Sequence, residues 1–184
     1  MRQEIQLAGF GGQGIITAGF ILGRAAAIYD RKEAVFTQSY GPEARGGACA
    51  AEVVISDGPI DYPLVTRPDL VVCMSQEAYN KYGVALADGA ELIVDSDLVE
   101  AGSNGIQRLP AMRLATDLGN RMAANVVMLG FLICVTGIVS REALEKSVRE
   151  TVRPRLLELN LRALSTGFEY GLSETSASQQ KAAP

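Results

Sequence analysis

The sequence predicts an α/β fold, and three observations support this class. Segments with the pattern of strands alternate with segments of helical pattern along the chain. The runs Leu70–Met74 and Leu92–Val94 are continuously apolar, as expected of parallel strands that are covered on both faces. A turn with four glycines joins the first strand to the first helix. Together they predict a single open, mostly parallel sheet with helices on both faces and a Rossmann-like arrangement.

The same patterns place the elements along the chain. Each strand is an apolar run bounded by turn-forming residues, and each helix is a longer segment of helical period. The expected strands are Glu4–Ala8, Ala34–Thr37, Ala48–Ile55, Leu70–Met74, Leu92–Asp95 and Gly105–Leu109. The expected helices are Gly14–Tyr29, Glu77–Val84, Ala115–Leu118 leading into Arg121–Thr136, Arg141–Val152 and Asn160–Gly171.

The first strand and helix are joined by GFGGQG, which is the first candidate site. Gly9, Gly11 and Gly14 fit G-x-G-x-x-G, with Gly12 extra and Gln13 beside it. Gly9 can turn sharply, Gly11 lets a ligand or backbone come close, and Gly14 lets the helix lie close to the sheet. The helix start offers unpaired N–H groups and a positive dipole end to an anion. A tight turn can also use glycine for purely structural reasons, and this alternative stays open.

The loop between the second and third strands, TQSYGPEARGGACAAE, is the second candidate site. Its turn-forming residues mark a loop that leaves the same sheet edge as the glycine turn. Ligands of doubly wound sheets lie beyond the carboxyl ends of the strands, so both loops could line one crevice. A solvated surface loop is the structural alternative. The candidate residues are Ser39, Tyr40, Gly41, Arg45, Gly46 and Gly47.

The acidic residues near the second strand argue against ordinary NAD binding. A dinucleotide site needs a carboxylate at the end of the second strand to hold the ribose hydroxyls. Asp30 and Glu33 instead precede this strand, and Gln38 to Gly41 follow it.

The helix at residues 121–139 is apolar on nearly all sides. Its uncharged stretch is too short for a membrane span, so a buried or interface helix is expected. In a small domain such a helix is expected to pack against another subunit, with Asn125 either bonded in that interface or solvated. The next helix begins with Ser140 as N-cap.

The sequence predicts one folded domain followed by a disordered C-terminal tail. Residues 1–172 form one domain, because a chain of this length can bury about 70% of its unfolded surface. From Ser173 the sequence is polar, small and without periodicity, so residues 173–184 are expected to be a disordered tail.

Composition excludes several classes of function. The net charge of −4 and the pI of about 5.0 argue against a nucleic-acid surface. The first residues lack the apolar run of a signal peptide, which predicts a cytoplasmic protein. Three separated cysteines and no histidine exclude an encoded iron–sulfur or zinc site, and they remove the usual general base. The thiols are expected to be reduced and buried or half-buried.

Four motifs together resemble one known family. They are GFGGQG, QSYGPEARGG, SxEAY (Ser75, Glu77, Ala78, Tyr79) and NxxxLG (Asn125, Leu129, Gly130). In this order and spacing they resemble the gamma subunit of 2-oxoacid:ferredoxin oxidoreductases, over about residues 3–170. Among its branches, the chain looks most like the 2-oxoglutarate (2-oxoglutarate synthase) type.

The resemblance implies a fold of the pyruvate-ferredoxin oxidoreductase domain III type and a subunit of an enzyme that oxidises 2-oxoacids with CoA to acyl-CoA and CO₂ while reducing ferredoxin. It implies that this chain alone binds no cofactor, and that thiamine diphosphate, Mg²⁺ and iron–sulfur clusters belong to partner subunits. The implied partners are alpha and beta subunits, with a ferredoxin-like delta subunit and a homodimer of the isolated chain left open. No catalytic or metal-binding residue is assigned to this chain.

Several alternatives remain at this point. The substrate could be pyruvate, 2-oxoisovalerate or indolepyruvate. The glycine turn could bind CoA or only a partner subunit. The chain could also be a self-sufficient nucleotide-binding α/β domain, which would bind nucleotide in isolation.

Overall fold

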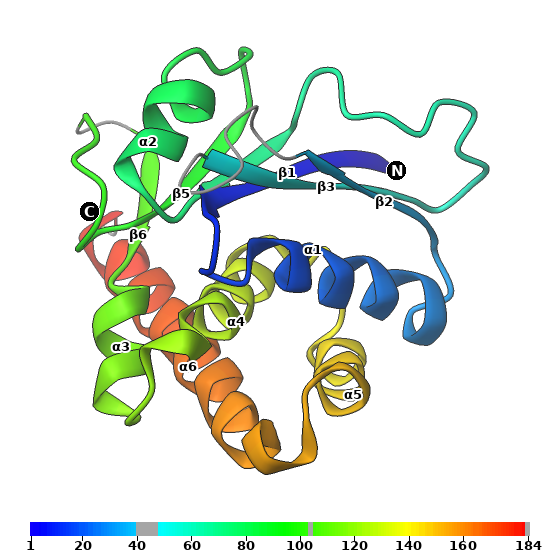
Figure 1. Cartoon of the computed structure of the whole chain (residues 1–184). Helices are drawn as coiled ribbons and strands as arrows, with labels where there is room; N and C mark the ends of the chain where they lie inside the picture. Colours follow the sequence, from blue (N-terminus) through cyan, green and yellow to red (C-terminus); the bar gives the residue numbers. More distant parts are fainter. Residues whose placement is uncertain (40–47, 103–104, 183–184) are drawn as a thin grey trace.

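The computed structural model describes residues 1–39, 48–102 and 105–182, with side chains up to residue 176. At its centre is one sheet of six strands in the order β2-β3-β1-β4-β5-β6 (Figure 1). The strands are β1 (Arg2–Phe10), β2 (Glu33–Ser39), β3 (Ala48–Ser56), β4 (Leu70–Cys73), β5 (Glu91–Asp95) and β6 (Ile106–Leu109). Each lies where the sequence predicts a strand.

The sheet is parallel except for β3. β1, β4, β5 and β6 are parallel neighbours, whereas β3 is antiparallel to both β1 and β2. Residues 40–47 join β2 to β3, and so short a connection permits antiparallel pairing but no crossover. β3 therefore separates β2 from β1, which are adjacent in the usual dinucleotide fold.

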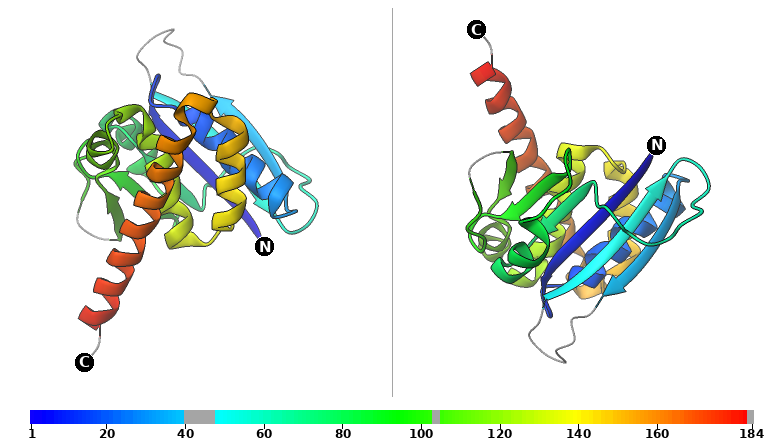
Figure 2. Two further views of the ribbon diagram at one scale, coloured as in Figure 1. Left: turned by 90° about the horizontal axis from the view of Figure 1, so that it is seen from below. Right: turned by 90° about the horizontal axis from the view of Figure 1, so that it is seen from above.

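Helices cover both faces, as predicted (Figure 1). α2 lies on one face, and α1, α3, α4, α5 and α6 lie on the other, with α6 projecting past the rest of the molecule (Figure 2). The α-helices are α1 (Ile15–Arg24), α2 (Gln76–Ala78), α3 (Ala111–Asp117), α4 (Ala124–Thr136), α5 (Arg141–Thr151) and α6 (Leu157–Ala182). Short π and 3-10 segments extend them: η1 (Ala25–Tyr29), η2 (Tyr79–Gly83), η3 (Arg121–Ala123) and η4 (Pro154–Leu156).

The expectation that α4 needs another subunit to cover it is wrong. Every residue of 124–133 is buried within the chain, chiefly beneath α6 and α3. At the crossing of α4 and α6, a β-carbon on Gly130 would lie 2.1 Å from the Leu164 carbonyl oxygen, and one on Gly167 would lie 1.9 Å from the Val127 oxygen. The two backbones are in direct contact, so α6 supplies the missing cover.

The C-terminal segment also differs from expectation. α6 continues through Ala182, whereas the sequence pattern predicts a helix end at Gly171 and a disordered tail over 173–184. The described hydroxyls satisfy helix carbonyls: Ser173 donates to Tyr170 O, and Thr175 to Gly171 O. Neither glycine nor proline interrupts residues 172–182, so the helix has no local reason to stop. The domain boundary at residue 172 stays a prediction.

The end of α1 is joined to the start of α5 by one carboxylate. α1 passes into the π turn η1, in which Asp30 N–H donates to Ala25 O at 3.1 Å. The Asp30 carboxylate accepts from both the N–H and the hydroxyl of Ser140, at 2.6 and 2.7 Å. Ser140 Oγ in turn accepts from Ala143 N–H at 3.1 Å, which confirms it as the N-cap of α5.

The three thiols are free, as predicted. Cys49 and Cys73 are buried and Cys134 is half-buried. Burial raises the pKa of Cys73 to about 12, and it also raises the pKa of Cys49 and Cys134. All three therefore stay protonated near neutral pH and are poor nucleophiles. Within the described ranges no helix is long and apolar enough to cross a membrane.

The close crossing of α4 and α6 leads to a prediction about the free energy of unfolding. Gly167→Ala should lower the free energy of unfolding by about 1–3 kcal/mol, because the methyl group must push two backbones apart. This loss should appear although alanine favours a helix over glycine by roughly 1 kcal/mol. Urea unfolding followed by circular dichroism measures it. Gly58→Ala is the control, because no described atom lies within 4 Å of its β-carbon position. Equal stability of the two variants would contradict the close crossing.

Candidate functional site

The side chain of Gln13 closes the glycine turn that follows β1. Its Oε1 accepts from Phe10 N–H at 2.7 Å, and its Nε2 donates to Met74 O at 2.8 Å. The first bond closes the turn on itself, and the second ties it to the residue after β4. Gln13 therefore holds the turn in shape, and its amide is already bonded within the chain.

The glycines have different roles from those the spacing predicts. Gly14 adopts φ 75° and Gly12 adopts φ 97°, so these two make the turn. A β-carbon on Gly9 would lie 2.5 Å from Gln13 Oε1, so Gly9 serves close packing rather than a sharp turn. Around Gly11 no described atom lies within 4 Å of that position. Gly11 thus faces open space, as a residue approached by a ligand or partner would.

Asn125 connects α4 to the glycine turn. It is only 6% exposed, and its Nδ2 donates to Gly14 O at 3.0 Å. A β-carbon on Gly14 would lie 2.5 Å from the same Nδ2, so the contact with α4, together with the positive φ, requires glycine here, and packing on the sheet does not. The bond is internal, which corrects the expectation of a subunit interface or a solvated amide.

A cavity of about 320 Å³ opens beside the turn. Arg121 of η3 borders it, and its guanidinium makes no hydrogen bond or ion pair with any described residue. No carboxylate is part of the described lining. A guanidinium without a partner beside a glycine turn is suited to an anion. The lining residues are Gly11, Gly12, Gln13, Met112, Arg121, Met122 and Ala124.

Arg121, Met112 and Met122 were not identified by sequence reasoning. They lie about a hundred positions beyond the turn, and no local pattern relates them to it. The nearest signal is the NxxxLG motif, because its asparagine, Asn125, contacts the turn.

Asp95 holds the helix that contributes Met112. It is fully buried at the end of β5, and its carboxylate accepts from the N–H groups of Asp97 and Met112 at 3.0 and 2.9 Å. Burial raises its pKa, although these two hydrogen bonds act in the opposite direction. Because one oxygen bonds to the backbone just after β5 and the other to the backbone at the start of α3, Asp95 is a structural residue.

The sheet register brings the end of β2, after which the second candidate loop begins, to the same sheet edge as the glycine turn. Ser39 pairs with Ala50, and Ala50 pairs with Ala8, one residue before Gly9. Ser39 thus lies two strands from the glycine turn, about 10 Å across the sheet. Of the predicted site residues, Tyr40, Gly41, Arg45, Gly46 and Gly47 lie outside the described residues.

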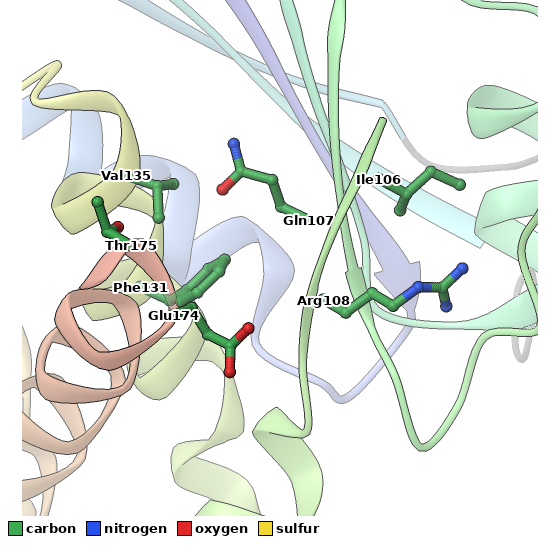
Figure 3. Close-up of a pocket in the computed structure, with 7 residues that line it drawn as sticks. All are labelled: Ile106, Gln107, Arg108, Phe131, Val135, Glu174 and Thr175. Atoms are coloured by element: carbon green, nitrogen blue, oxygen red, sulfur yellow. The ribbon is translucent and has the colours of Figure 1, made fainter. Parts of the chain in front are cut away.

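A second cavity, of about 430 Å³, lies near the other end of the strands (Figure 3). Phe131, Val135 and Thr175 lie on one side of it and Gln107 on the other. The nearby guanidinium of Arg108 is occupied, because it donates to the carbonyls of residues 101 and 102. The cavity therefore lacks the unpartnered cation found beside the glycine turn. Its remaining lining residues are Ile106 and Glu174.

Known proteins with similar sequences are subunits of 2-oxoacid oxidoreductases. The chain is 53% identical to "2-oxoglutarate synthase subunit KorC" of Methanocaldococcus jannaschii, over 92% of this chain and 94% of that protein. It is 49% identical to the subunit of the same name from Methanothermobacter marburgensis, over 92% and 96%. Against "Pyruvate synthase subunit PorC" of Methanothermobacter thermautotrophicus the identity is 31%, over 90% and 94%.

Solved structures show the same fold. The gamma subunit of a keto/oxoacid ferredoxin oxidoreductase from Geobacter sulfurreducens has a TM-score of 0.85 and 45% identity, over 94% of this chain and 98% of that one. The pyruvate oxidoreductase subunit PORC of Thermotoga maritima has a TM-score of 0.72 and 30% identity, over 91% and 96%.

One family model covers the part of the chain that contains the glycine turn, the Arg121 cavity and α4. The model of the pyruvate ferredoxin/flavodoxin oxidoreductase family covers residues 4–170. Sequence, fold and motif order agree, and this chain belongs to the pyruvate ferredoxin/flavodoxin oxidoreductase family.

Proposed function

We propose that this chain is the gamma subunit of a 2-oxoglutarate:ferredoxin oxidoreductase. The complex would oxidatively decarboxylate 2-oxoglutarate with CoA to succinyl-CoA and CO₂, and would reduce ferredoxin. The observation that carries the proposal is the 53% identity to a KorC subunit over nearly the full length of both chains. The lower identity to a pyruvate synthase subunit, 31%, favours the 2-oxoglutarate branch over the pyruvate branch.

The chain's own contribution is anion binding and positioning. The start of α1 has no side-chain cap and no acidic residue in its first turn. Its N–H groups and Arg121 suit the phosphates of CoA, since a guanidinium can give two parallel charge-assisted hydrogen bonds. Ser39, Tyr40, Gly41, Arg45, Gly46 and Gly47 would complete this site from the neighbouring loop.

The redox chemistry would belong to partner subunits. Thiamine diphosphate with Mg²⁺ supplies the carbanion chemistry of decarboxylation, and iron–sulfur clusters accept the electrons. The described residues contain no cluster of three or more His, Cys, Asp or Glu side chains suited to a metal. We place these groups on alpha and beta subunits, with a ferredoxin-like delta subunit as a further partner, and the complex in the cytoplasm.

A self-sufficient dinucleotide-binding domain is a weaker alternative. The residue at the start of β2, Glu33, is at the wrong end of that strand for a ribose, and β3 separates β2 from β1. The assay below compares 2-oxoglutarate with the substrates of the other branches, which are pyruvate, 2-oxoisovalerate and indolepyruvate.

The isolated chain should be folded but inactive. Co-expressed with its alpha and beta partners, it should support CoA-dependent reduction of ferredoxin with 2-oxoglutarate at a rate well above that with pyruvate. Spectrophotometric ferredoxin reduction, with each 2-oxoacid in turn, measures this. Decarboxylation by the isolated chain would contradict the subunit assignment, and a preference for another 2-oxoacid would contradict only the branch.

Arg121→Ala should raise the KM for CoA by up to about tenfold and leave the KM for 2-oxoglutarate unchanged. The reason is the loss of a charged hydrogen bond, worth about 1.5–3 kcal/mol when shielded from water and less at an exposed position. Arg45→Ala tests the neighbouring loop in the same way. Arg162→Ala removes an exposed cation outside the cavity lining and is the matched control. An unchanged KM for CoA in both test variants would show that CoA does not bind at this site.

Gly11→Val provides an independent test of ligand approach. The structure has room for the side chain, and Gly11 is not among the glycines with positive φ. The variant should therefore fold with an unchanged Tm, while the activity of the assembled complex falls because the valine fills the approach to the turn. Full activity would show that nothing approaches Gly11.

A further inference from the structure

The connection from β3 to β4 is a long loop with a fixed shape. Residues 57–69 contain neither helix nor strand. The loop arches out on the face of the sheet opposite α1 (Figure 1). Loops of this length without secondary structure are uncommon in compact domains and are usually functional or disordered. The contacts below show that this one is ordered.

A buried carboxylate holds the returning arm of the loop. Glu4 of β1 is 7% exposed, and its Oε2 accepts from the N–H groups of Thr66 and Arg67 at 2.7 and 2.9 Å. Its other oxygen bonds to the guanidinium of Arg2. Asp69 fastens the end of the arm, because its carboxylate accepts from Glu4 N–H at 2.8 Å. Three of these hydrogen bonds join the arm to β1, and the backbone N–H of Asp69, which donates to Glu4 O at 2.8 Å, adds a fourth.

The outgoing arm is held as well. Arg2 Nη2 donates to Tyr62 O at 2.9 Å, and the amino terminus pairs with Asp57 at 2.9 Å. Burial alone would raise the pKa of Glu4, but the N–H of Arg67, the guanidinium of Arg2 and the N–H of Thr66 together lower it. Glu4 is therefore ionised near neutral pH, where its hydrogen bonds are strongest.

The tip of this loop presents apolar side chains to solvent. Tyr62 is 53% exposed and Leu64 is 46% exposed, with Pro63 between them. Asp61 precedes them and forms no ion pair with a described residue. Tyrosine has few rotatable bonds and proline has a fixed φ, so little conformational entropy remains to be lost on binding. A tip that is held in place and yet exposed is suited to docking.

The loop is remote from the cavity at the glycine turn. It packs on the amino end of β1, whereas the glycine turn follows the carboxyl end. From Glu4, which holds the loop, to Phe10 at the end of β1 the strand runs six residue steps, or about 20 Å. A partner bound at the loop would leave the Arg121 cavity open.

We propose that residues 61–64 dock a neighbouring subunit of the oxidoreductase complex. The partner would present an apolar socket for Tyr62 and Leu64, with a lysine or arginine at its rim for Asp61. We expect a concave socket on the partner because the tip of the loop is convex. We expect a positive charge at its rim because the Asp61 carboxylate has no ion-pair partner among the described residues. A second copy of this chain fits less well, since twofold pairing of the tips would bring two Asp61 carboxylates together. The proposal rests on the proposed function only in requiring a multisubunit complex.

The test measures assembly rather than catalysis. The double variant Tyr62→Ser/Leu64→Ser should raise the Kd for the purified alpha–beta complex at least tenfold, as loss of a central aromatic anchor does. Its Tm should match that of the wild type, because both side chains are exposed. Ile28→Ser/Val84→Ser is the matched control, since these residues are 61% and 65% exposed elsewhere on the surface. The control should bind normally.

Two further variants separate the parts of the proposal. Asp61→Asn should slow association and reduce its dependence on salt. Glu4→Gln keeps the tip but loosens its support, so hydrogen exchange at residues 61–67 should quicken and the Kd should rise several-fold.

Three outcomes would overturn the proposal. One is wild-type affinity in the double variant. Another is failure of the wild-type chain to bind the alpha–beta complex. The third is a concentration-dependent dimer of the isolated chain, seen by light scattering and lost in the double variant. A complex that assembles through the loop but oxidises another 2-oxoacid would refute only the substrate assignment, so the two failures are distinguishable.

Discussion

The architecture depends on the direct backbone contact between α4 and α6 at Gly130 and Gly167. This contact lets α6 cover a helix that has no polar face of its own, and it fixes how α4 lies against α6. Asn125, in the first turn of α4, is thereby positioned to bond Gly14 O. The shape of the glycine turn is thus set by the helix layer as well as by β1. A substitution at the crossing would therefore alter the shape of the glycine turn, although the two are far apart along the chain.

Much of this fold could be predicted from the sequence. Strand positions followed from apolar runs between turn residues, and the N-cap of α5 followed from Ser140, because these signals are local. The cover of α4 could not be predicted, since an apolar surface does not say which segment will meet it, and Gly167 lies far along the chain. The end of α6 was missed because a polar composition without helix breakers permits both a helix and a disordered tail.

The candidate site was predictable in place but not in detail. The glycine spacing located the turn, whereas the roles of Gly9 and Gly14 depend on Gln13 and Asn125, whose side-chain contacts no spacing rule contains. Arg121 was missed for a similar reason. It reaches the cavity only because η3 and α4 are stacked beside the turn, which is a property of tertiary packing.

The π turn at the end of α1 has a consequence for how the chain can vary in length. A π turn holds one residue more than an α turn, and each residue rotates the helix by about 100°. The additional residue within Ala25–Tyr29 therefore sets the direction in which Asp30 leaves the helix toward Ser140. A single deletion there would convert the segment to a regular helix and rotate Asp30 away from α5. Surface loops in general tolerate changes of length. At this helix end, by contrast, an insertion or deletion rotates the residues that follow it and breaks a tertiary contact.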